Sequence, residues 1–500
     1  MPIVRHTKII ATVGPACESK EQLLKLMEAG ADIFRLNFSH GDHAGKTRII
    51  ERIRRLSQRR RRAVAIIGDL QGPKIRIGKL ENDEIKLSAG QELLLSTNDL
   101  IGNQQCIPVR FAGLAREVHK GQRILLDDGL IELEVLDTSG EEVRCKVRSG
   151  GLLKSRKGVN LPESHLSLPA FTEQDRNDID FAIAAGLDYL ALSFVRTAAD
   201  VQALQMHLTS LEADLPIIAK IEKPQAVANF AAILEVADGI MVARGDLGVE
   251  IGPEQVPLIQ KQIIRQCREA GKPVITATQM LESMVNQPRP TRAEASDVAN
   301  AILDGSDAIM LSAETAVGKF PAEAVAFMDR MAQRVENDPP LRNSVFNLYP
   351  SNGGSCNLSD AIGEAACRTA ANIKAAAILA FTQTGATAMR LARYRPANPI
   401  YAITPSRKVR RRLTLYAGVR SLQVDFQGDT EAQIRSLEKA VLEAGVLNRG
   451  DLVIITMGSP LAAQGTTNLM KAHRLDNGLY NSATRGHLDP APPTGLCSSS

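Results

Sequence analysis

A lysine and a glutamate stand two positions apart at the end of an apolar run. In Ile217–Glu222 (IIAKIE), Lys220 and Glu222 are the only charged residues. Side chains at alternate positions of a strand lie on one face, and charges in an apolar strand are costly to bury unless they are paired or functional. The spacing therefore indicates either a structural salt bridge or a lysine beside a metal-binding carboxylate.

A second carboxylate follows the next apolar run, in the sequence ARGDLG. Asp246 offers hard oxygen atoms, and Gly245 lets a ligand approach the backbone closely. Two carboxylates that share the coordination with water and substrate oxygens suit Mg2+. The other interpretation of Asp246 is an ordinary turn residue.

Further polar side chains stand at the ends of other apolar runs. RLNFS carries Arg35, Asn37 and Ser39 at alternate positions, and the guanidinium of Arg35 is a planar fork that fits phosphate. A lysine, arginines and two carboxylates together indicate Mg2+-assisted phosphoryl transfer, in which positioning and charge neutralisation do most of the catalysis. Candidates of the same kind after other runs are Asp69, Lys74 and Arg76, then Thr276 and Thr278 on one expected strand face, and Glu314 at the expected mouth.

Eight short apolar runs must position these residues. Each is followed by a helical pattern, and near-continuous apolar runs are typical of strands buried on both faces of a parallel sheet. Eight such units predict a (β/α)8 barrel with its active site at the carboxyl ends of the strands. One predicted helix is Glu254–Ala270, with Gly271 as its C-cap. The runs are Lys8–Gly14, Ile33–Ser39, Ala63–Leu70, Tyr189–Phe194, Ile217–Glu222, Gly239–Gly245, Val274–Gln279 and Ala308–Glu314.

The chain contains more than the barrel. Residues 71–167 show strand-and-turn texture, so we expect an inserted small β-barrel lid domain over the barrel mouth. Residues 1–70 and 168–348 would then form the (β/α)8 domain. Residues 349–482 predict a C-terminal open α/β domain, and residues 483–500, rich in proline, glycine and serine, predict a flexible tail.

Charge and cysteine content narrow the class of protein. Sixty basic and 56 acidic residues give a net charge of +4, which argues against binding of nucleic acid or a membrane surface by charge. The basic runs Arg59–Arg62 and Arg407–Arg412 keep a nucleic-acid-binding module as an alternative. No apolar run reaches the roughly 18 residues of a membrane span. Seven cysteines without a CxxC pair indicate reduced thiols in a cytoplasmic protein.

An ordered set of motifs resembles the pyruvate kinase family. RLNFSHG, GPKIR, KGVNLP, AKIEKP, MVARGDLGVE, TATQMLESM, PTRAEASDVANA and SAETAVGKFP follow one another in the family's order. The resemblance implies a barrel, an inserted mobile lid and a C-terminal regulatory domain. It also implies phosphoryl transfer from phosphoenolpyruvate to ADP, the last step of glycolysis, in a cytoplasmic homotetramer.

The same resemblance implies roles for individual residues. Glu222 and Asp246 would hold Mg2+ or Mn2+, and Lys220 would neutralise the phosphoryl group in flight. Thr278 would lie near the methylene carbon that is protonated. The implied catalytic residues are Lys220, Arg35, Thr278 and Arg76; the implied substrate-binding residues are Gly245, Asp246, Thr278, Ser193 and Lys220; and the implied nucleotide-binding residues are Arg35, Asn37, His40, Arg76 and Lys157.

A different enzyme could use a similar site. A barrel lyase or aldolase that forms a Mg2+-bound enolate from a keto acid would also need Lys220, Glu222 and Asp246. The inserted domain and GPKIR favour the kinase, because aldol cleavage needs no nucleotide clamp. A coupled assay for ADP-dependent pyruvate formation discriminates between the two.

A hydroxyl-rich loop in the C-terminal part suggests regulation. Thr382, Thr384, Gly385 and Thr387 stand between an apolar run and a helical pattern, where a helix N-terminus can bind an anion. The other interpretation is a plain capping turn. By resemblance the loop would bind a phosphorylated effector, and Ala386 in it favours a sugar monophosphate or AMP over fructose 1,6-bisphosphate.

The motif GPKIR departs from the family pattern GPEIR. Lys74 replaces an acidic residue near the family's K+ site, so its ammonium could supply the charge and K+ would not be required. Alternatively, Lys74 pairs with a nearby carboxylate and K+ still binds. The residues of the expected vestigial cation site are Asn37, Ser39, Asp69 and Leu70.

Overall fold

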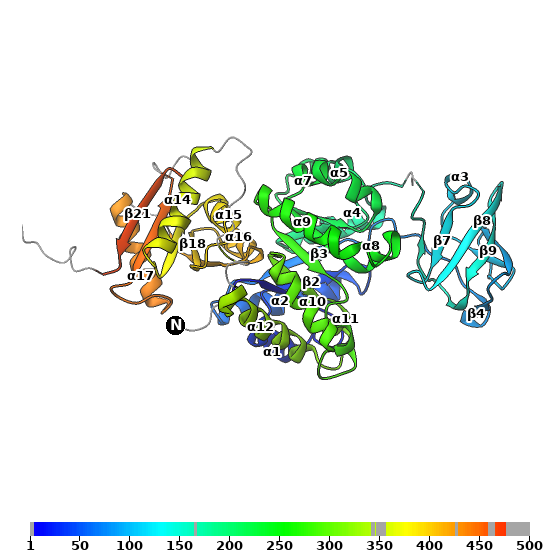
Figure 1. Ribbon diagram of the computed structural model, residues 1–500, viewed down its shortest axis with the longest axis horizontal. Coiled ribbons are helices and arrows are strands. Elements are labelled where there is room, and N and C mark those ends of the chain that lie inside the picture. The colour runs from blue at the N-terminus through cyan, green and yellow to red at the C-terminus, as the bar shows by residue number, and fades with distance from the viewer. Residues whose placement is uncertain are drawn as a thin grey trace, which may run out of the picture.

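The computed structural model describes residues 5–164, 168–341, 346, 357–425, 429–458 and 466–476. Three units follow one another along a long axis, with a barrel in the middle, a small β unit at one end and an α/β unit at the other (Figure 1). This is the predicted fold class. The expected tail at 483–500 and the expected boundary near residue 349 lie outside the described residues.

The central unit is a closed barrel of eight parallel strands, which confirms the eight predicted runs. Most polar residues of the runs stand near the carboxyl end of their strand or just after it, so those residues gather at one mouth. The order around the barrel is β1-β16-β15-β14-β13-β12-β3-β2. The strands are β1 (Lys8–Thr12), β2 (Ile33–Asn37), β3 (Ala65–Asp69), β12 (Tyr189–Leu192), β13 (Ile217–Ile221), β14 (Gly239–Ala243), β15 (Val274–Ala277) and β16 (Ala308–Leu311).

Helices cover the outside of the barrel. The predicted helix at 254–270 is α9, which begins two residues later and ends at Gly271 with a left-handed φ of 70°, a conformation that glycine adopts without strain. The helices of this unit are α1 (Lys20–Ala29), α2 (His43–Arg59), α4 (Glu173–Ala184), α5 (Ala198–Ser210), α6 (Pro224–Ala228), α7 (Phe230–Val236), α8 (Arg244–Ile251), α9 (Val256–Ala270), η2 (Glu282–Val285), α10 (Arg292–Leu303), α11 (Ala313–Ala316) and α12 (Pro321–Asn337).

Alternation along the strands separates two hydrophobic clusters. Ile9, Phe34 and Ile217 pack with residues of the surrounding helices. Ile10 and Ile218 belong to a second cluster, which fills the barrel interior with strand residues. This cluster continues into the C-terminal unit, which closes the barrel at the end opposite the mouth. Residues two and four positions after Ile218 share its inward face, which places the charged pair of β13 inside the mouth.

Residues between β3 and α4 form the small β unit, which we call the insertion. Its strands make a six-stranded sheet, β11-β7-β8-β9-β5-β6, and a two-stranded sheet, β10-β4, around one hydrophobic cluster. The elements are η1 (Glu81–Asp83), β4 (Glu84–Leu87), β5 (Glu92–Ser96), β6 (Cys106–Pro108), α3 (Leu114–Glu117), β7 (Arg123–Leu126), β8 (Ile131–Ser139), β9 (Glu142–Ser149), β10 (Gly151–Lys154) and β11 (Val159–Asn160).

The C-terminal unit is an open five-stranded sheet in the order β19-β18-β17-β20-β21, with β21 antiparallel to β20. Its elements are α14 (Leu358–Asn372), β17 (Ala377–Phe381), α15 (Ala386–Arg393), β18 (Ile400–Thr404), α16 (Arg407–Arg412), η3 (Leu413–Leu415), β19 (Val419–Gln423), α17 (Thr430–Glu443), β20 (Leu452–Met457) and β21 (Leu469–Arg474). No helix among the described residues is both long and apolar enough to span a membrane.

The basic run of α16 joins this unit to the barrel. Arg411 Nε lies 2.6 Å from Asp188 Oδ1, and Arg412 Nη1 lies 3.0 Å from Asp214 Oδ2. Lys408 also contacts Asp214, at 2.9 Å. Three cations of a run that could have faced nucleic acid therefore pair with carboxylates of the barrel.

Candidate active site at the barrel mouth

Lys220 is the centre of the polar cluster inside the mouth. Its ammonium donates to Ser193 Oγ at 2.7 Å and lies 2.8 Å from Glu222 Oε1 and 3.2 Å from Asp69 Oδ1. Only 9% of the residue is exposed. The predicted shared face of Lys220 and Glu222 is thus realised, and the ends of β12 and β3, the next two strands around the barrel, supply Ser193 and Asp69.

The carboxylates keep Lys220 charged. Burial alone would lower the pKa of Lys220, but Asp69 and Glu222 outweigh burial and raise it. Burial raises the pKa of Glu222 and Asp246 acts in the same direction, whereas Lys220 stabilises its ionised form. A cation placed between Glu222 and Asp246 would relieve their repulsion.

Asp69 joins the two principal cations of the mouth. Its Oδ2 accepts from Arg35 Nε at 2.6 Å, while its other oxygen faces Lys220. Arg35 also donates to Thr12 Oγ1 at 3.2 Å. Burial raises the pKa of Asp69, but Arg35 and Lys220 outweigh burial and lower it, so the carboxylate is ionised. The sequence interpretation named Asp69 among the polar residues at the strand ends and as part of a monovalent cation site, but did not predict its contact with Arg35 and Lys220.

The two expected metal ligands leave adjacent strands. Glu222 follows β13 and Asp246 follows β14, and these strands pair in parallel. Glu222 Oε2 also accepts from Phe194 N at 2.7 Å, which fixes the carboxylate. Within the described residues, no group of three or more His, Cys, Asp and Glu side chains is placed to hold a metal ion. Two hard carboxylates suit an ion such as Mg2+ that takes its other ligands from water and substrate.

Lys74 lies close to Asp246, one of the two expected metal ligands. Its Nζ is 3.7 Å from Asp246 Oδ1, which is the carboxylate pairing that the sequence left open. Within the described part of the chain, no hydrogen bond or ion pair joins Lys74 to the other expected cation-site residues. Those residues have partners of their own: Asn37 Oδ1 accepts from Ser39 N at 3.0 Å, and Leu70 O accepts from Ser193 Oγ at 2.8 Å.

Thr278 occupies a strained turn where β15 ends. Its φ is 68° and that of Gln279 is 52°. A left-handed conformation is unusual for a β-branched residue, and such residues cost about 1–3 kcal/mol each unless the surroundings enforce them. Thr278 Oγ1 accepts from Gly245 N at 2.7 Å, which connects the turn to the start of α8.

One neighbouring expectation, the shared face of Thr276 and Thr278, is wrong, whereas Glu314 does follow the carboxyl end of β16. Thr276 does not share a face with Thr278, because the strand ends at Ala277; its hydroxyl instead contacts Ser306 Oγ at 2.7 Å in the interior. Glu314 is fully buried and accepts from the backbone N–H groups of Leu281 and Ser312 at 3.0 and 2.7 Å. Its role is to satisfy buried backbone donors.

Three residues expected to hold the nucleotide lie apart from the cluster. Arg76 donates to Arg156 O at 3.2 Å, and Lys157 Nζ lies 2.8 Å from Asp127 Oδ1, both within the insertion. His40 is exposed, and its backbone carbonyl accepts a hydrogen bond from Lys46 Nζ. None of the three has a hydrogen bond or ion pair with Lys220, Glu222 or Asp246 in the described regions.

A groove of about 960 Å³ runs between the insertion and the barrel. Arg123, Asp128 and Gly129 line it from the insertion, and Gly245 lines it from the barrel mouth. The groove therefore reaches the candidate metal site and has the size of a pocket for a small-molecule cofactor or substrate.

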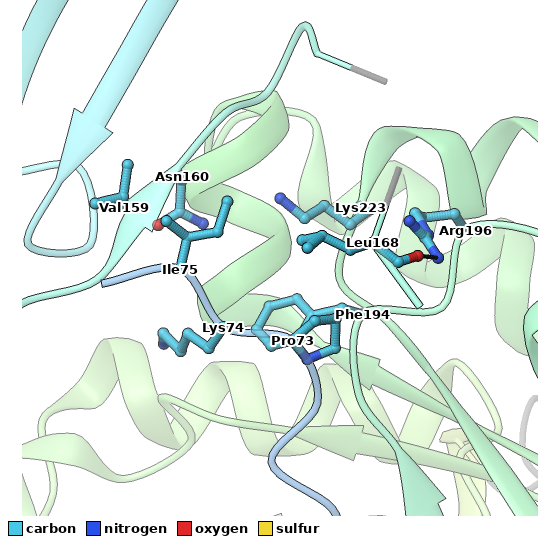
Figure 2. Close-up of a pocket in the computed structure, with 9 residues that line it drawn as sticks. All are labelled: Pro73, Lys74, Ile75, Val159, Asn160, Leu168, Phe194, Arg196 and Lys223. Atoms are coloured by element: carbon cyan, nitrogen blue, oxygen red, sulfur yellow. Dashed lines mark hydrogen bonds between the residues drawn. The ribbon is translucent and has the colours of Figure 1, made fainter. Parts of the chain in front are cut away.

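The insertion is fastened where its two connections meet the barrel. Figure 2 shows Lys74, Asn160, Phe194 and Lys223 around a small cavity of about 30 Å³ at this junction. Asn160 Nδ2 donates to Glu250 Oε1 at 2.7 Å, and Lys223 binds the same oxygen. Glu250 is buried, so these polar contacts between the insertion and the barrel are shielded from solvent.

The candidate effector loop lies between β17 and α15, as predicted. Thr382 Oγ1 accepts from Gly385 N at 2.8 Å, and Gly385 has a φ of 99°. Thr387 Oγ1 lies 3.0 Å from Thr467 Oγ1, and Ala386 N donates to Thr384 Oγ1 at 3.5 Å. The loop is thus ordered by its own hydroxyl groups, far along the molecule from the barrel mouth (Figure 1).

Comparisons with known proteins agree with this architecture. The chain matches the family models described as pyruvate kinase, barrel domain, over residues 4–325 and pyruvate kinase, alpha/beta domain, over residues 360–473. It is 48% identical over 472 residues to a pyruvate kinase of Geobacillus stearothermophilus, covering 94% of this chain and 80% of that protein. It is 46% identical over 473 residues to that of Bacillus licheniformis, with the same coverage.

A solved structure gives the same result in three dimensions. A crystal structure of a pyruvate kinase from Cryptosporidium parvum superposes with a TM-score of 0.87 at 39% identity, covering 94% of this chain and 96% of that one. Two family models together match most of the sequence, and relatives well above 30% identity match it nearly end to end. The chain therefore belongs to the pyruvate kinase family of phosphotransferases.

Proposed function

We propose that this chain transfers the phosphoryl group of phosphoenolpyruvate to ADP at the barrel mouth. The bond between phosphorus and the enol oxygen breaks, phosphorus bonds to a β-phosphate oxygen of ADP, and the enolate takes a proton at its methylene carbon to give pyruvate. The observation that supports this most strongly is a charged, buried Lys220 held between Asp69, Glu222 and Ser193.

Lys220 and Arg35 would bind the phosphoryl oxygens. Their shared partner Asp69 fixes both cations before substrate arrives, so little reorganisation is needed as negative charge spreads over the phosphoryl group. Gly245 and Asp246 would offer backbone N–H groups to the substrate carboxylate. Thr278 would lie beside the carbon that is protonated.

Glu222 and Asp246 would hold Mg2+ or Mn2+. When bound, such an ion neutralises charge on the substrate oxygens and orients them. Phe194 N keeps Glu222 in place, and the partly exposed Asp246 directly follows Gly245, which lines the groove under the insertion.

The nucleotide would lie in the groove between barrel and insertion. Arg76 and Lys157 are on the insertion and away from Lys220, so they would reach the nucleotide phosphates only when the insertion moves toward the mouth. His40 and Asn37 would contribute from the β2 side. A lyase acting on a keto acid would have no use for such a groove.

Lys74 would make K+ unnecessary. Beside Asp246, its ammonium adds positive charge next to the substrate phosphate, where relatives with an acidic residue use a monovalent cation. The loop Thr382–Thr387 would bind a sugar monophosphate or AMP as activator, and the assembly would be a homotetramer. Kinetics with a panel of phosphorylated metabolites tests the effector, and fructose 1,6-bisphosphate as the strongest activator would contradict our preference.

A coupled assay tests the proposed reaction. Pyruvate formation should require both ADP and a divalent cation, with one ATP formed for each pyruvate. Cleavage of a keto acid without ADP would instead support the lyase.

A further inference from the structure

Arg244 spans from the start of α8 to the end of the neighbouring strand β15. Its side chain is 10% exposed, and Nη1 lies 2.6 Å from Asp297 Oδ1 on α10. Nη2 donates to Thr278 O at 2.8 Å and to Gln279 O at 3.2 Å. The guanidinium of Arg244 thus donates to two consecutive carbonyl groups, and the carboxylate of Asp297 fixes the position of the guanidinium.

The segment that Arg244 holds is the strained turn at the mouth. Thr278 and Gln279 both have positive φ, and neither is a residue type that favours this region. Conformations of this kind persist where several contacts enforce them, and they concentrate at functional sites. The carbonyl hydrogen bonds of Arg244 are contacts of that kind.

The residue after Arg244 holds the same threonine from its other side. Gly245 N donates to Thr278 Oγ1, so consecutive residues of α8 fix the carbonyl and the hydroxyl of Thr278. The next residue, Asp246, is the expected metal ligand. The Thr278 hydroxyl, which itself donates to Ala277 O at 2.6 Å, is therefore tied to the segment that carries the expected metal ligand.

We infer that Arg244, held by Asp297, is a positioning residue that keeps Thr278 in the left-handed conformation needed for protonation of the product carbon. The inference rests on the proposed function. Arg244 lines the groove, but its guanidinium is bonded to Asp297 and to the carbonyls of Thr278 and Gln279, so it would contact neither phosphoenolpyruvate nor the metal. Its loss should therefore slow the step that involves Thr278 more than it weakens substrate binding.

The first experiment separates turnover from binding. Arg244→Met should lower kcat by about a hundredfold, in the range of general acid–base effects, with little change in KM for phosphoenolpyruvate. Exchange of the pyruvate methyl hydrogens with D2O, followed by NMR, should slow in parallel. Arg244→Lys and Asp297→Asn should give intermediate losses. Arg395→Met is the matched control, because Arg395 also donates to two consecutive carbonyl groups, Gly305 O and Ser306 O, and pairs with Asp307, but does not line the groove.

The second experiment tests the backbone conformation itself. Gln279→Asn introduces a residue that tolerates positive φ, whereas Gln279→Val introduces one that resists it. In the Arg244→Lys background, the Asn change should recover several-fold of the lost exchange rate, and the Val change should lower it further. If Arg244 served only the stability of the fold, the Asn and Val changes would not have opposite effects on the exchange rate.

The outcomes distinguish the inference from the function on which it rests. A wild-type enzyme that forms no pyruvate from phosphoenolpyruvate and ADP would overturn the proposed function. An active wild type with unchanged kcat and methyl exchange in Arg244→Met would overturn the inference alone. If Arg244→Met does not fold, equal effects of Asn and Val at position 279 in the Arg244→Lys protein would overturn it.

Discussion

Asp69 Oδ1 lies 3.2 Å from Lys220 Nζ, across the barrel interior from β3 to β13. The strand β12 lies between β3 and β13 in the barrel, so the contact joins two strands that are not hydrogen-bonded to each other. Because the other oxygen of Asp69 holds Arg35, one carboxylate sets the spacing of the two cations that we propose bind phosphate.

Asp69→Asn should therefore impair catalysis without removing either cation. We expect kcat to fall by about 10- to 100-fold, because Lys220 and Arg35 keep their charge but lose their common partner. Steady-state kinetics measures the change. Asp238→Asn is the matched control, since Asp238 accepts from Ile217 N at the opposite end of β13 and should affect stability rather than kcat. An unchanged kcat in Asp69→Asn would show that Asp69 does not organise the site.

The contact between Asn160 and Glu250 should control the insertion. Asn160→Ala removes its only side-chain hydrogen bond to the barrel in the described structure and leaves Glu250 paired with Lys223. We expect faster hydrogen exchange at the two connecting segments and a higher KM for ADP. Asn103→Ala, inside the insertion and away from the junction, is the control. Equal hydrogen exchange in Asn160→Ala and Asn103→Ala would show that the contact between Asn160 and Glu250 does not hold the insertion in place.

The charge of Lys74 should decide the response to K+. The wild type should be substantially active with tetramethylammonium as the only monovalent cation and gain little when K+ is added. Lys74→Glu should be less active and more responsive to K+, because it replaces a positive charge beside Asp246 by a negative one. A wild-type enzyme that is inert without K+ would disprove this prediction.

A buried ion cluster at the opposite end of the barrel should make stability depend on pH. Asp32 lies 2.7 Å from Arg5 and 2.8 Å from Arg62. Burial raises the pKa of Asp32, but Arg5 and Arg62 outweigh it and lower the pKa well below that of an unfolded aspartate. The ionised carboxylate therefore stabilises the fold above about pH 4, and this contribution is lost as pH falls through the lowered pKa.

Asp32→Asn should lower the free energy of unfolding by about 3 kcal/mol near neutral pH, because it removes the carboxylate shared by Arg62 and the buried Arg5, which keeps only Asp329. The difference from the wild type should shrink below about pH 4. Urea unfolding at a series of pH values measures it. Asp329→Asn, which removes a more exposed partner of Arg5, should cost less. A difference that does not vary with pH would contradict the assignment.

The barrel and the face of Lys220 could be predicted because both depend on local periodicity. Apolar runs end where strands end, and a two-residue spacing fixes a shared face. The joint contact of Asp69 with Arg35 and Lys220 could not be predicted, because it depends on how strands far apart in the chain close into a barrel. The pairing of Lys74 with Asp246 likewise depends on how the insertion docks.

The turn at Thr278 was missed for a different reason. TATQM contains no glycine or asparagine to indicate a positive φ, so alternation was carried past the end of the strand. The enforcing contact comes from Arg244, more than thirty residues earlier, and has no local signature. The same limit applies to α16, whose basic run gave no indication that its partners were Asp188 and Asp214.

The most direct test is the kcat of Lys220→Met. Methionine keeps the length of the side chain and removes the charge that we propose faces the migrating phosphoryl group. Lys272→Met is the control, because Lys272 donates to three backbone carbonyls at the C-terminal end of α7, away from the mouth, and should affect stability alone. We expect kcat of Lys220→Met to fall about a thousandfold or more while the protein still binds a divalent cation and phosphoenolpyruvate. A near-normal kcat would contradict the role of Lys220 in phosphoryl transfer.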